Sequence, residues 1–488
     1  MLEGFAAEAV PPIEVTGLQY DSRKAGPGEA FFAFPGERVD GHAFVPNALA
    51  AGAAAIVSER LAPDGMESRW ARVGHGRRAL AHAALRFYGR PDRTLTVTAV
   101  TGTNGKTTTV HLIDSLLRSA GKTTALLGTI EHRVGPFTEK SINTTPESLD
   151  IVRFLARLRD LGGTHATMEA SSHALELERI RGLEFHTAVF TNLTPDHLDF
   201  HGDMESYAAS KHRLFEGAGA KPPRFAVANA DTEAGRSFLR IGKSEAVSYG
   251  RSADADVRAR QVWSGSTGLR FEVDTPAGPI CAEAPLVGDF NVENLLAAIA
   301  AVQCHGMSVS QIEMGLREVE SVPGRFEVID EGQPFLVIVD YAHTAAALER
   351  LIEAARAIAN RSQPPGRVLV LFGCGGDRDR TKREPMGRIA GRLSDFALLT
   401  SDNPRGEDPL QIIREVANGL EGGAAHWTLE PDRRAAIGAV LAEARRNDVV
   451  LVAGKGHETT QVIADGRVEF DDRVAARSAL HQMGYANQ

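Results

Sequence analysis

A glycine-rich turn between a β-branched run and a helix-compatible segment constrains this chain more than any other feature. The apolar run over residues 95–100 stops at Gly102, and a helix-compatible segment follows Lys106. Gly102 and Gly105 let backbone N–H groups point inward, while Lys106 and Thr107 supply an ammonium and a hydroxyl group. A strand, a glycine turn and a helix start in this order predict a phosphate-binding loop in an α/β domain.

The loop is a shortened variant of the common eight-residue pattern, because Val100 stands five places before Gly105, where that pattern has glycine. A chance Gly-Lys-Thr triplet in a solvated turn is the alternative, and the strand and the polar residues before the triplet weigh against it. In loops of this kind the lysine reaches the β- and γ-phosphates and the hydroxyl coordinates Mg²⁺. We therefore predict a nucleoside triphosphate ligand, with ATP as the expected one.

Charge and cysteine content argue against several other classes of protein. The chain has 488 residues and a formal net charge of −9, so a nucleic acid is not the expected main partner. The three cysteines, Cys281, Cys304 and Cys374, are widely spaced and include no metal-binding pair. The first residues lack the features of a signal peptide, and no apolar run reaches the length of a membrane span. We expect a cytoplasmic protein with reduced thiols and no membrane insertion.

Short apolar strands alternate with alanine-rich helices along the chain, and turn clusters at residues 89–92 and 322–325 divide it. We predict an α/β protein of three domains. They are a small α/β domain over residues 1–90, a central phosphate-loop domain with a mainly parallel sheet over residues 91–324, and a doubly wound, Rossmann-like domain over residues 325–488. Polar residues follow the predicted strands, so we expect the chemistry at the carboxyl ends of the strands.

Polar residues at the ends of two later strands are candidates for catalysis. Glu169 ends the strand over residues 166–169, where it could hold Mg²⁺ or serve only as a helix cap or surface group. The segment 191–202 contains two histidines and two aspartates and predicts a second divalent-ion site. A capped helix start at residues 194–196 is compatible with that site because it uses different atoms. Lys211 lies in a helix-like run, where a lone lysine is ordinarily solvated.

Five motifs occur in order, at residues 101–108, 169–173, 191–197, 340–343 and 454–458. Together they resemble the Mur ligase family, the ATP-dependent enzymes that form amide bonds in peptidoglycan synthesis. The resemblance extends from Asp21 to Glu458, and the segment 402–405 narrows it to the members that add meso-diaminopimelate. A uridine-nucleotide-binding role for the first domain is part of what the resemblance implies.

The resemblance implies that ATP and Mg²⁺ are the cofactors. ATP would be bound by Gly102, Thr103, Asn104, Gly105, Lys106, Thr107, Thr108, Asn294, Arg325 and Asp340. The metal ligands would be Thr107, Glu169, His197 and Lys211, the last as N6-carboxylysine, a carbamate formed with CO₂. Lysine suits this modification because a desolvated amine can be neutral and nucleophilic. The expected catalytic residues are Lys106, Glu169, His197 and Lys211.

The resemblance also implies two further substrates, UDP-MurNAc-L-Ala-D-Glu and meso-diaminopimelate. The first would contact Tyr20, Asp21, Ser22, the turn at 37–39, Asn143, Thr144, Thr145, Ser171, Leu177 and Arg179. The second would contact Arg378, Asp402, Asn403, Pro404, Arg405, Gly454 and Glu458. ATP would phosphorylate the γ-carboxylate of D-glutamate, and the amine of diaminopimelate would attack the resulting acyl phosphate.

The charges of the second group match the distal end of diaminopimelate, which carries one carboxylate and one ammonium group. Arg405 offers a planar fork for the carboxylate and Arg378 a further cation, while Glu458 supplies an anion for the ammonium group. Lysine lacks the distal carboxylate and would leave Arg405 unpaired. The alternative for residues 402–405 is a plain turn, since Asn-Pro starts turns freely.

Two other functions stay open. A folylpolyglutamate-synthetase-like ligase would share the ATPase and C-terminal domains but would not need the first domain. A nucleotide-gated switch protein would be supported by a guanine-reading Asn-Lys-x-Asp segment, which the sequence lacks. One departure from the family pattern is Ala345, where the family usually has proline. We expect a monomer.

Overall fold

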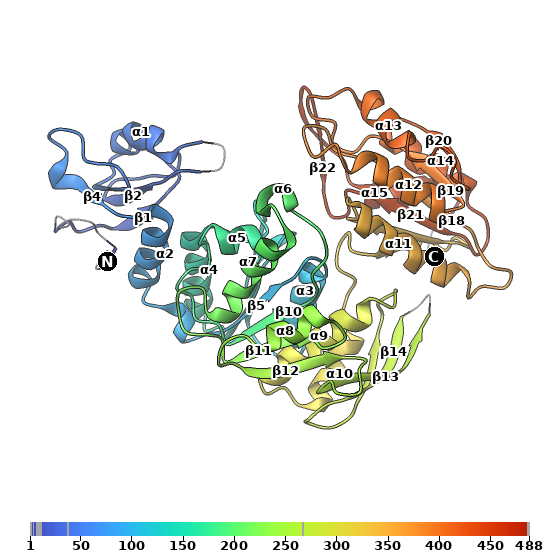
Figure 1. The fold of residues 1–488 in the computed structure, drawn as a ribbon, viewed down its shortest axis with the longest axis horizontal. Helices are drawn as coiled ribbons and strands as arrows, with labels where there is room; N and C mark the ends of the chain where they lie inside the picture. Colours follow the sequence, from blue (N-terminus) through green and yellow to red (C-terminus); the bar gives the residue numbers. More distant parts are fainter. Residues whose placement is uncertain (1, 3, 6–11, 37–38, 266–267, 486–488) are drawn as a thin grey trace. The chain divides into compact units, whose positions relative to one another are not determined.

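A computed structural model describes residues 2, 4–5, 12–36, 39–265 and 268–485 of the chain (Figure 1). The chain separates into two compact units, which are considered one at a time. Unit 1 comprises Met1–Arg258, Asp274–Gly278 and Glu293–Gly315. Unit 2 comprises Ala259–Val273, Pro279–Val292 and Leu316–Gln488. Both are mixed α/β units, which confirms the predicted fold class.

The first sheet of unit 1 consists of four parallel strands in the order β1-β2-β3-β4. They are β1 (Gly17–Gln19), β2 (Glu29–Ala33), β3 (Ala55–Ser58) and β4 (Trp70–Arg72), accompanied by η1 (Gly41–Phe44), α1 (Val45–Ala50), η2 (Glu67–Arg69) and α2 (Gly76–Phe87). Side chains alternate along β2: Phe31 belongs to a small core on one face, whereas Ala30 and Phe32 belong to a larger core on the other. That larger core continues into the central sheet, so the first sheet and the central sheet are packed as one unit.

The central sheet of unit 1 carries the phosphate loop. Its strands follow the order β12-β11-β10-β5-β9-β6-β7-β8, and the pairings from β12 to β6 are parallel. The strands are β5 (Thr96–Thr101), β6 (Thr124–Leu127), β7 (Glu131–Val134), β8 (Phe137–Lys140), β9 (His165–Glu169), β10 (Thr187–Phe190), β11 (Phe225–Asn229) and β12 (Glu245–Gly250). The helices are η3 (Pro91–Arg93), α3 (Lys106–Ser119), α4 (Ser148–Asp160), α5 (Ser172–Glu176), α6 (Leu198–His201), α7 (Met204–Glu216), α8 (Glu233–Leu239), α9 (Asn291–Cys304) and α10 (Val309–Arg317).

The predicted strand, glycine turn and helix around the phosphate loop are confirmed as β5, the loop and α3. One detail is wrong: residues 194–196 do not start a helix. Helix α6 begins at Leu198 with His197 at its N-cap, and the side chain of Asp203 caps the next helix by accepting from Ser206 N. Instead, the backbone N–H and carbonyl of Thr194 are both hydrogen-bonded to Thr103 Oγ1 of the phosphate loop, at 3.0 and 3.1 Å.

Unit 2 contains a second parallel sheet, in the order β16-β17-β21-β18-β19-β20, in which only the pairing of β16 with β17 is antiparallel. The strands are β16 (Glu327–Ile329), β17 (Leu336–Asp340), β18 (Val368–Phe372), β19 (Phe396–Leu399), β20 (His426–Leu429) and β21 (Val449–Ala453). The helices are α11 (Ala345–Ala359), α12 (Arg383–Leu393), α13 (Pro409–Ala417), α14 (Arg433–Glu443) and α15 (Asp472–Gln482). The remaining strands form two groups. Strands β13 (Val257–Ser264), β14 (Leu269–Asp274) and β15 (Ile280–Ala284) continue the central sheet beyond β12, to eleven strands, and β22 (Thr460–Ile463) and β23 (Gly466–Glu469) form an antiparallel pair.

The strands of this second sheet bury side chains on both faces. Val370 on β18 packs in one core with residues of α11, α12 and α13, whereas its neighbours Leu369 and Leu371 pack in another core with α14 and α15. Continuous apolar runs are expected for parallel strands with helices on both sides. The predicted doubly wound, Rossmann-like arrangement is therefore confirmed.

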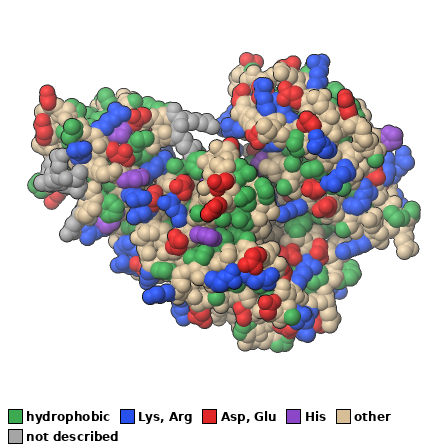
Figure 2. All heavy atoms as spheres, in the orientation of Figure 1, with side chains coloured by type: hydrophobic (Ala, Val, Ile, Leu, Met, Phe, Trp, Pro, Cys, Tyr) green, Lys and Arg blue, Asp and Glu red, His purple; other side chains and the backbone are tan. Residues whose placement is uncertain are grey.

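None of the helices in the described part of the chain is long and apolar enough to cross a membrane. On the face shown in Figure 2, basic and acidic side chains are intermixed over the surface.

Candidate active site

The phosphate loop connects β5 to α3 and depends on two glycines with left-handed backbone angles, Gly102 (φ 145°) and Gly105 (φ 83°). A Cβ atom on Gly102 would lie 2.0 Å from Thr191 Oγ1, and one on Gly105 would lie 2.5 Å from Asn294 Oδ1. Side chains at either position would therefore collide with the surrounding structure. Lys106 Nζ donates to the carbonyl oxygens of Gly102 and Thr103, at 2.8 Å each, so the ammonium lies against the loop.

The segment that follows β10 holds the loop in place. Asn192 accepts from the backbone of the loop twice, through its carbonyl oxygen from Thr103 N at 2.8 Å and through Oδ1 from Asn104 N at 2.9 Å. Thr191 Oγ1 donates to Asn104 O at 2.6 Å. These bonds shape the loop. Gly105 and Lys106 follow at the N-terminus of α3, and a helix N-terminus favours binding of a phosphate group.

Glu169 ends β9 and lies beside the start of α3. Its Oε2 accepts from Thr107 Oγ1 at 3.0 Å and its Oε1 accepts from Thr129 N at 2.7 Å, and the residue is 1% exposed. A hydroxyl and a carboxylate placed together are the hard oxygen ligands that Mg²⁺ prefers. Thr107 and Glu169 therefore fit the predicted metal site.

Lys211, on helix α7, is buried against the same loop. The residue is 1% exposed, its Nζ donates to Gly102 O at 3.1 Å, and Nζ lies 4.3 Å from the centre of the Tyr207 ring. Burial, reinforced by the charge of Lys106, holds the pKa of the Lys211 amine well below its ordinary value. The expectation from the sequence alone, a solvated helical lysine, is wrong, and the environment favours a neutral amine.

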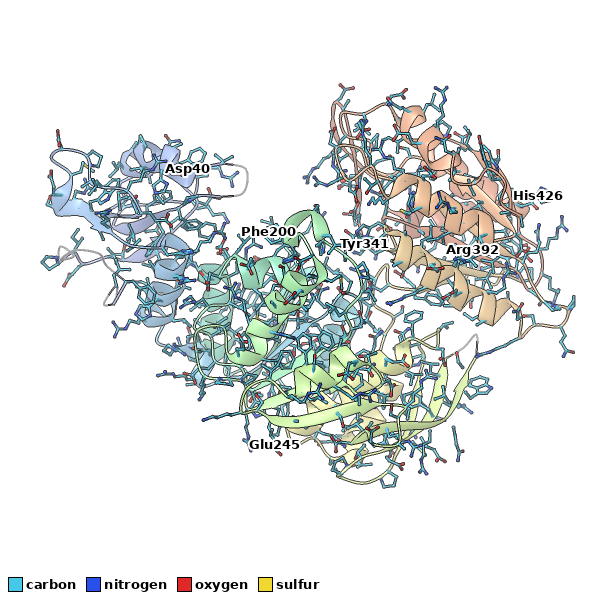
Figure 3. The ribbon with its side chains drawn as sticks, in the orientation of Figure 1. Asp40, Phe200, Glu245, Tyr341, Arg392 and His426 are labelled. Atoms are coloured by element: carbon cyan, nitrogen blue, oxygen red, sulfur yellow. The ribbon has the colours of Figure 1, made fainter. Side chains whose placement is uncertain are left out.

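His197, at the N-cap of α6, and His201, in α6, both have their rings close to that of His173 on α5. Phe200 of the same helix is labelled in Figure 3. The ring of His173 is 4.8 Å from that of His197 and stacks at 4.1 Å on Phe200. His201 Nε2 bonds to Ser172 Oγ at 2.9 Å. In the described part of the chain no three His, Cys, Asp or Glu side chains are grouped to hold a metal ion. The predicted four-residue metal site from two histidines and two aspartates is therefore not preformed.

Four residues predicted to bind the nucleotide-sugar substrate converge on the carboxyl end of β9. Thr145 Oγ1 donates to Glu169 O at 2.8 Å and accepts from Ser171 N at 3.1 Å. Arg179 Nη1 donates to Thr145 O at 3.2 Å, and Thr144 Oγ1 accepts from Thr129 Oγ1 at 3.2 Å. This places a guanidinium group and several hydroxyl groups beside the candidate metal ligand.

The other predicted residues for this substrate are more dispersed. Tyr20 follows β1, and its hydroxyl donates to Asp150 Oδ2 on α4 at 2.5 Å. Ser22 lies in the next turn, Asn143 is exposed before α4, and Leu177 ends α5. In the predicted turn at 37–39, residues 37 and 38 lie outside the described residues.

Residues predicted for the adenine side of ATP fall in both units. Asn294, on α9, lies against Gly105 of the phosphate loop in unit 1. In unit 2, Asp340 ends β17 and its carboxylate accepts from Phe326 N at 2.7 Å and Ala342 N at 2.8 Å. The guanidinium of Arg325 lies 4.5 Å from the centre of the Tyr341 ring (Figure 3). Burial raises the pKa of Asp340, an effect that Arg325 opposes.

The residues predicted to bind diaminopimelate meet in unit 2, at the carboxyl ends of β18, β19 and β21. Asn403 connects them: its Nδ2 donates to Glu458 Oε2 at 2.9 Å, and its carbonyl oxygen accepts from Arg405 Nη1 at 3.3 Å. Burial lowers the pKa of the Arg405 guanidinium, and the nearby charge of Arg378 adds to this. Two adjacent cations beside the carboxylate of Glu458 are a suitable receptor for an α-amino acid group.

Several contributing residues had not been predicted. Tyr207 bonds through its hydroxyl to Thr103 Oγ1 at 3.2 Å, and no motif pointed to it. Lys455 lies inside the 454–458 motif, and a lysine between two glycines could have drawn attention. It is 0% exposed, and its Nζ donates to Asn403 Oδ1 at 3.1 Å and to Glu458 Oε2 at 2.9 Å. Lys455 therefore provides the positive charge that balances Glu458 within the protein.

A cavity of about 310 Å³ in unit 1 lies away from these residues and is lined by Arg78, Arg90, Arg93 and others. These arginines are already bonded to Glu178 and Glu184 at 2.7–3.0 Å. The candidate active site is therefore not this cavity.

Three family models match the chain. They are the Mur ligase family catalytic domain over residues 14–88, the Mur ligase middle domain over residues 100–302, and the Mur ligase glutamate ligase domain over residues 324–456. The three matches follow the order of the three predicted domains.

Curated relatives match over nearly their full length. The UDP-N-acetylmuramoyl-L-alanyl-D-glutamate–2,6-diaminopimelate ligase of Solibacter usitatus is 53% identical over 472 residues, covering 97% of this chain and 94% of the relative. The ligase of the same name from Geobacillus kaustophilus is 45% identical, covering 99% and 98%.

Solved structures agree with this. A structure of a ligase of that name matches with a TM-score of 0.69 at 33% identity, covering 97% of this chain and 96% of the other. A folylpolyglutamate synthase of Mycobacterium tuberculosis, complexed with ADP and AMPPCP, matches with a TM-score of 0.62 at 16% identity and covers 84% of this chain. At that identity the second likeness shows a shared fold alone.

Proposed function

Because this chain belongs to the Mur ligase family, we propose that it is the ATP-dependent ligase that joins meso-diaminopimelate to UDP-MurNAc-L-Ala-D-Glu. The bond is an amide to the γ-carboxylate of D-glutamate, made in cytoplasmic peptidoglycan precursor synthesis. The names of relatives that are 45–53% identical over almost the whole chain support this function. We also propose that the protein is a monomer.

The grouping of Arg405, Arg378 and Glu458 in unit 2 is the main support for meso-diaminopimelate as the amino-acid substrate. The arginines offer two cations to the distal carboxylate, and Glu458 offers an anion to the distal ammonium group. Asn403 Nδ2 and Lys455 Nζ both donate to Glu458 Oε2, at 2.9 Å each, and fix the carboxylate. Asp402 and Gly454 lie beside these residues, and Pro404 precedes Arg405 in the same turn.

The first chemical step is phosphorylation of the substrate carboxylate by ATP. The backbone of residues 102–108 binds the phosphates, and the Lys106 ammonium turns from the loop carbonyls to the transferred phosphoryl group, whose charge it offsets. Thr107 and Glu169 would hold Mg²⁺, which supplies further positive charge to the phosphates when bound. Arg179, Thr144, Thr145 and Ser171 orient the acceptor. Asn294, Arg325 and Asp340 contribute to binding of the nucleoside.

Lys211 and His197 complete the proposed catalytic residues. A neutral Lys211 amine can attack CO₂, forming an N–C bond and releasing one proton, and the product is a carbamate. This converts a buried amine into a carboxylate-like metal ligand, which the crowded, low-water environment around Gly102 would protect. His197 lies at the start of α6 with its Nε2 3.6 Å from Asp196 Oδ2, within the same segment.

In the second step the amine of diaminopimelate attacks the acyl phosphate, and the tetrahedral intermediate collapses to the amide with release of phosphate. Exclusion of water matters because water would hydrolyse the acyl phosphate. The reaction requires both units, since the phosphate loop belongs to unit 1 and the amino-acid residues belong to unit 2.

A folylpolyglutamate-synthetase-like activity is the nearer alternative. The separate family match over residues 14–88 and the full-length relatives favour the proposed function over this one. The switch-type alternative predicts nucleotide binding without formation of an amide.

The decisive experiment incubates the purified protein with ATP, Mg²⁺ and UDP-MurNAc-L-Ala-D-Glu, with meso-diaminopimelate, with lysine or with neither. We expect ADP and a product enlarged by one diaminopimelyl residue only when meso-diaminopimelate is present. The Lys106→Ala variant serves as the inactive control, because it loses the phosphate contact at the loop surface. Preference for lysine, or ATP turnover without amide product, would refute the proposal.

A further inference from the structure

Two neighbouring loops of unit 2 carry the arginines of the proposed amino-acid site. The loop over residues 373–382 follows β18 and carries Arg378, and the loop over residues 400–408 follows β19 and carries Arg405. Strands β18 and β19 are parallel neighbours, so both loops start at the same edge of the sheet.

The two loops touch along their backbones. Gly376 N donates to Asn403 O at 2.9 Å, and Arg405 Nη1 donates back to Gly376 O at 2.8 Å. A Cβ atom on Gly376 would lie 1.9 Å from Pro404 O, so only glycine permits this approach. The orientation of the Arg405 guanidinium is thus set by the backbone of the other loop.

Glu407 bonds to both loops. It belongs to the 400–408 loop, yet its Oε1 accepts from Asp377 N at 2.6 Å and its Oε2 accepts from Arg380 at 2.7 Å. In turn, Asp377 Oδ2 of the 373–382 loop accepts from Gly406 N of the 400–408 loop at 3.0 Å. A single carboxylate therefore ties the segment that carries Arg378 to the segment that carries Arg405.

The side chain of Arg383 fixes Glu407 by hydrogen bonds. It is the first residue of α12, its side chain is 1% exposed, and it donates to both oxygens of Glu407 at 3.0 Å each. It also donates to Gly375 O at 3.2 Å and to Glu415 on α13 at 2.7 Å. The hydrogen bonds from Arg383 hold the pKa of Glu407 at about 2, so the carboxylate is charged at any working pH.

We propose that Glu407, fixed by Arg383, is a positioning residue that locks the two loops into one carboxylate receptor and thereby sets the affinity for the amino-acid substrate. The proposal rests on the function proposed above. Glu407 does not touch the substrate in this role, because its oxygens are bonded to Asp377, Arg380 and Arg383.

The physical need for such a lock is the repulsion between two cations. Arg378 and Arg405 lie close enough for the charge of one to lower the pKa of the other. Without a fixed backbone they would move apart before the substrate arrives, and binding would have to order both loops again. A preformed pair binds the carboxylate without that loss.

The test compares Glu407→Gln with Glu415→Gln in the full-length enzyme. Glu415→Gln is the matched control, because Glu415 bonds to the same arginine but to neither loop. We expect Glu407→Gln to raise the KM for meso-diaminopimelate about tenfold or more, with the KM values for ATP and UDP-MurNAc-L-Ala-D-Glu changed less than about twofold. We expect Glu415→Gln to leave all three KM values within about twofold of the wild type.

Glu407→Asp provides a second variant that retains the charge, in case the glutamine variant does not fold. The shorter side chain of aspartate can keep the bonds to Arg383 but cannot reach Asp377. We therefore expect a smaller rise in the KM for meso-diaminopimelate, again without a matching change for the other two substrates. An unchanged KM for meso-diaminopimelate, or an equal loss for all three substrates, would overturn the proposal. A wild-type enzyme that does not use meso-diaminopimelate would instead refute the proposed function, and that outcome is visible before any variant is made.

Discussion

Lys211 illustrates how much of the chemistry depends on the surroundings of one residue. In sequence it is a lysine on a helix, and such residues are usually solvated. In the structure its amine is buried beneath the phosphate loop and beside the Tyr207 ring. The Tyr207 ring is a local neighbour, one helical turn before Lys211 on α7. The burial cannot be deduced from the local sequence, because Gly102 of the phosphate loop lies about a hundred residues away.

We predict that Lys211→Ala is nearly inactive and that a short-chain carboxylate restores part of its activity. The added carboxylate can occupy the space of the missing side chain and replace the carbamate. Ligation rates of the variant measured with and without acetate or propionate provide the check. A rescue by methylamine but not by a carboxylate would point to a role for the amine itself and would contradict the carbamate.

We predict that Arg405→Ala raises the KM for meso-diaminopimelate about 10- to 100-fold, because a charged hydrogen bond contributes on the order of 1.5–3 kcal/mol. The KM for ATP should barely change, since the phosphate loop lies in the other unit. Steady-state assays in which each substrate is varied separately distinguish these effects. Activity with lysine need not appear, because removing one cation does not build a lysine site. An equal loss for every substrate would indicate that the turn has a folding role.

At the scale of elements, the sequence predicted strands and helices well and their contacts poorly. The strands predicted at residues 95–100 and 166–169 are confirmed as β5 and β9, because strands buried in a parallel sheet leave short apolar runs in the sequence. The helix start at residues 194–196 is wrong because hydrogen bonds to the phosphate loop, from a segment about ninety residues earlier, override the local preference. Convergence of loops at a sheet edge could be predicted, whereas the side chains that lock them, such as Glu407, could not.

Ala345, where the family usually has proline, stands at the first position of α11. The preceding residue Thr344 has an extended backbone (φ −123°, ψ 159°), which is the conformation required before proline, and its side chain caps the helix. We predict that Ala345→Pro raises the free energy of unfolding by about 0.4–1 kcal/mol, because proline reduces the conformational entropy of the unfolded chain. The helix tolerates proline at this position because the first helical N–H has no partner within the helix. Urea denaturation provides the measurement. Ala347→Pro is the matched control and should destabilise, since Ala347 N donates to Thr344 Oγ1.

Helix α9 ends beside three strands of the central sheet, and the histidine that follows it makes unit 1 sensitive to acid. Burial lowers the pKa of His305 to about 3, and its neighbours His165 and His186 add to this. Below its ordinary pKa of 6.5 the unfolded chain takes up a proton that the folded chain does not, so stability falls as the pH drops from 6.5 towards 3. At pH 5 the loss due to His305 is about 2 kcal/mol.

We therefore predict that His305→Gln flattens the dependence of stability on pH between 7 and 5. Glutamine retains an acceptor for Thr98 Oγ1, which bonds to His305 Nε2 at 2.9 Å. Denaturant unfolding of both proteins at pH 7 and pH 5 gives the difference. Parallel pH profiles for the two proteins would mean that His305 is not the responsible group.

At the scale of the molecule, unit 1 combines the first predicted domain with the central one. Core residues of the first sheet continue into the central core, and Arg77 on α2 donates to Glu147, just before α4, at 2.8 Å. Turn clusters in the sequence predicted a change of domain at residue 90. They could not show that the two parts share a core, because the residues that meet are far apart in the sequence, Arg77 and Glu147 by 70 residues.

We predict that Arg77→Met destabilises unit 1 by about 1–3 kcal/mol, since it removes the hydrogen-bond donor of a buried carboxylate while Arg179 stays 3.7 Å from that carboxylate. Burial raises the pKa of Glu147, and Arg77 opposes that effect, so the variant leaves a carboxylate in an unfavourable environment. The double variant Arg77→Met with Glu147→Gln should recover part of the loss. Thermal denaturation of the wild type, the single variant and the double variant measures both effects, and a double variant no more stable than the single one would contradict the ion-pair explanation.

The contact of Gly376 with the Pro404 carbonyl has a consequence for how selectivity can change between related enzymes. The sequences of two loops whose backbones are in contact cannot change independently, because a side chain introduced at the contact on one loop collides with the other loop. A chimaera that receives only residues 400–408 from a ligase with a different amino acid should lose its substrate without gaining the new one. Exchange of residues 373–383 together with residues 400–408 keeps the contacting surfaces of the two loops matched. A change of amino-acid selectivity should therefore require that both loops change together.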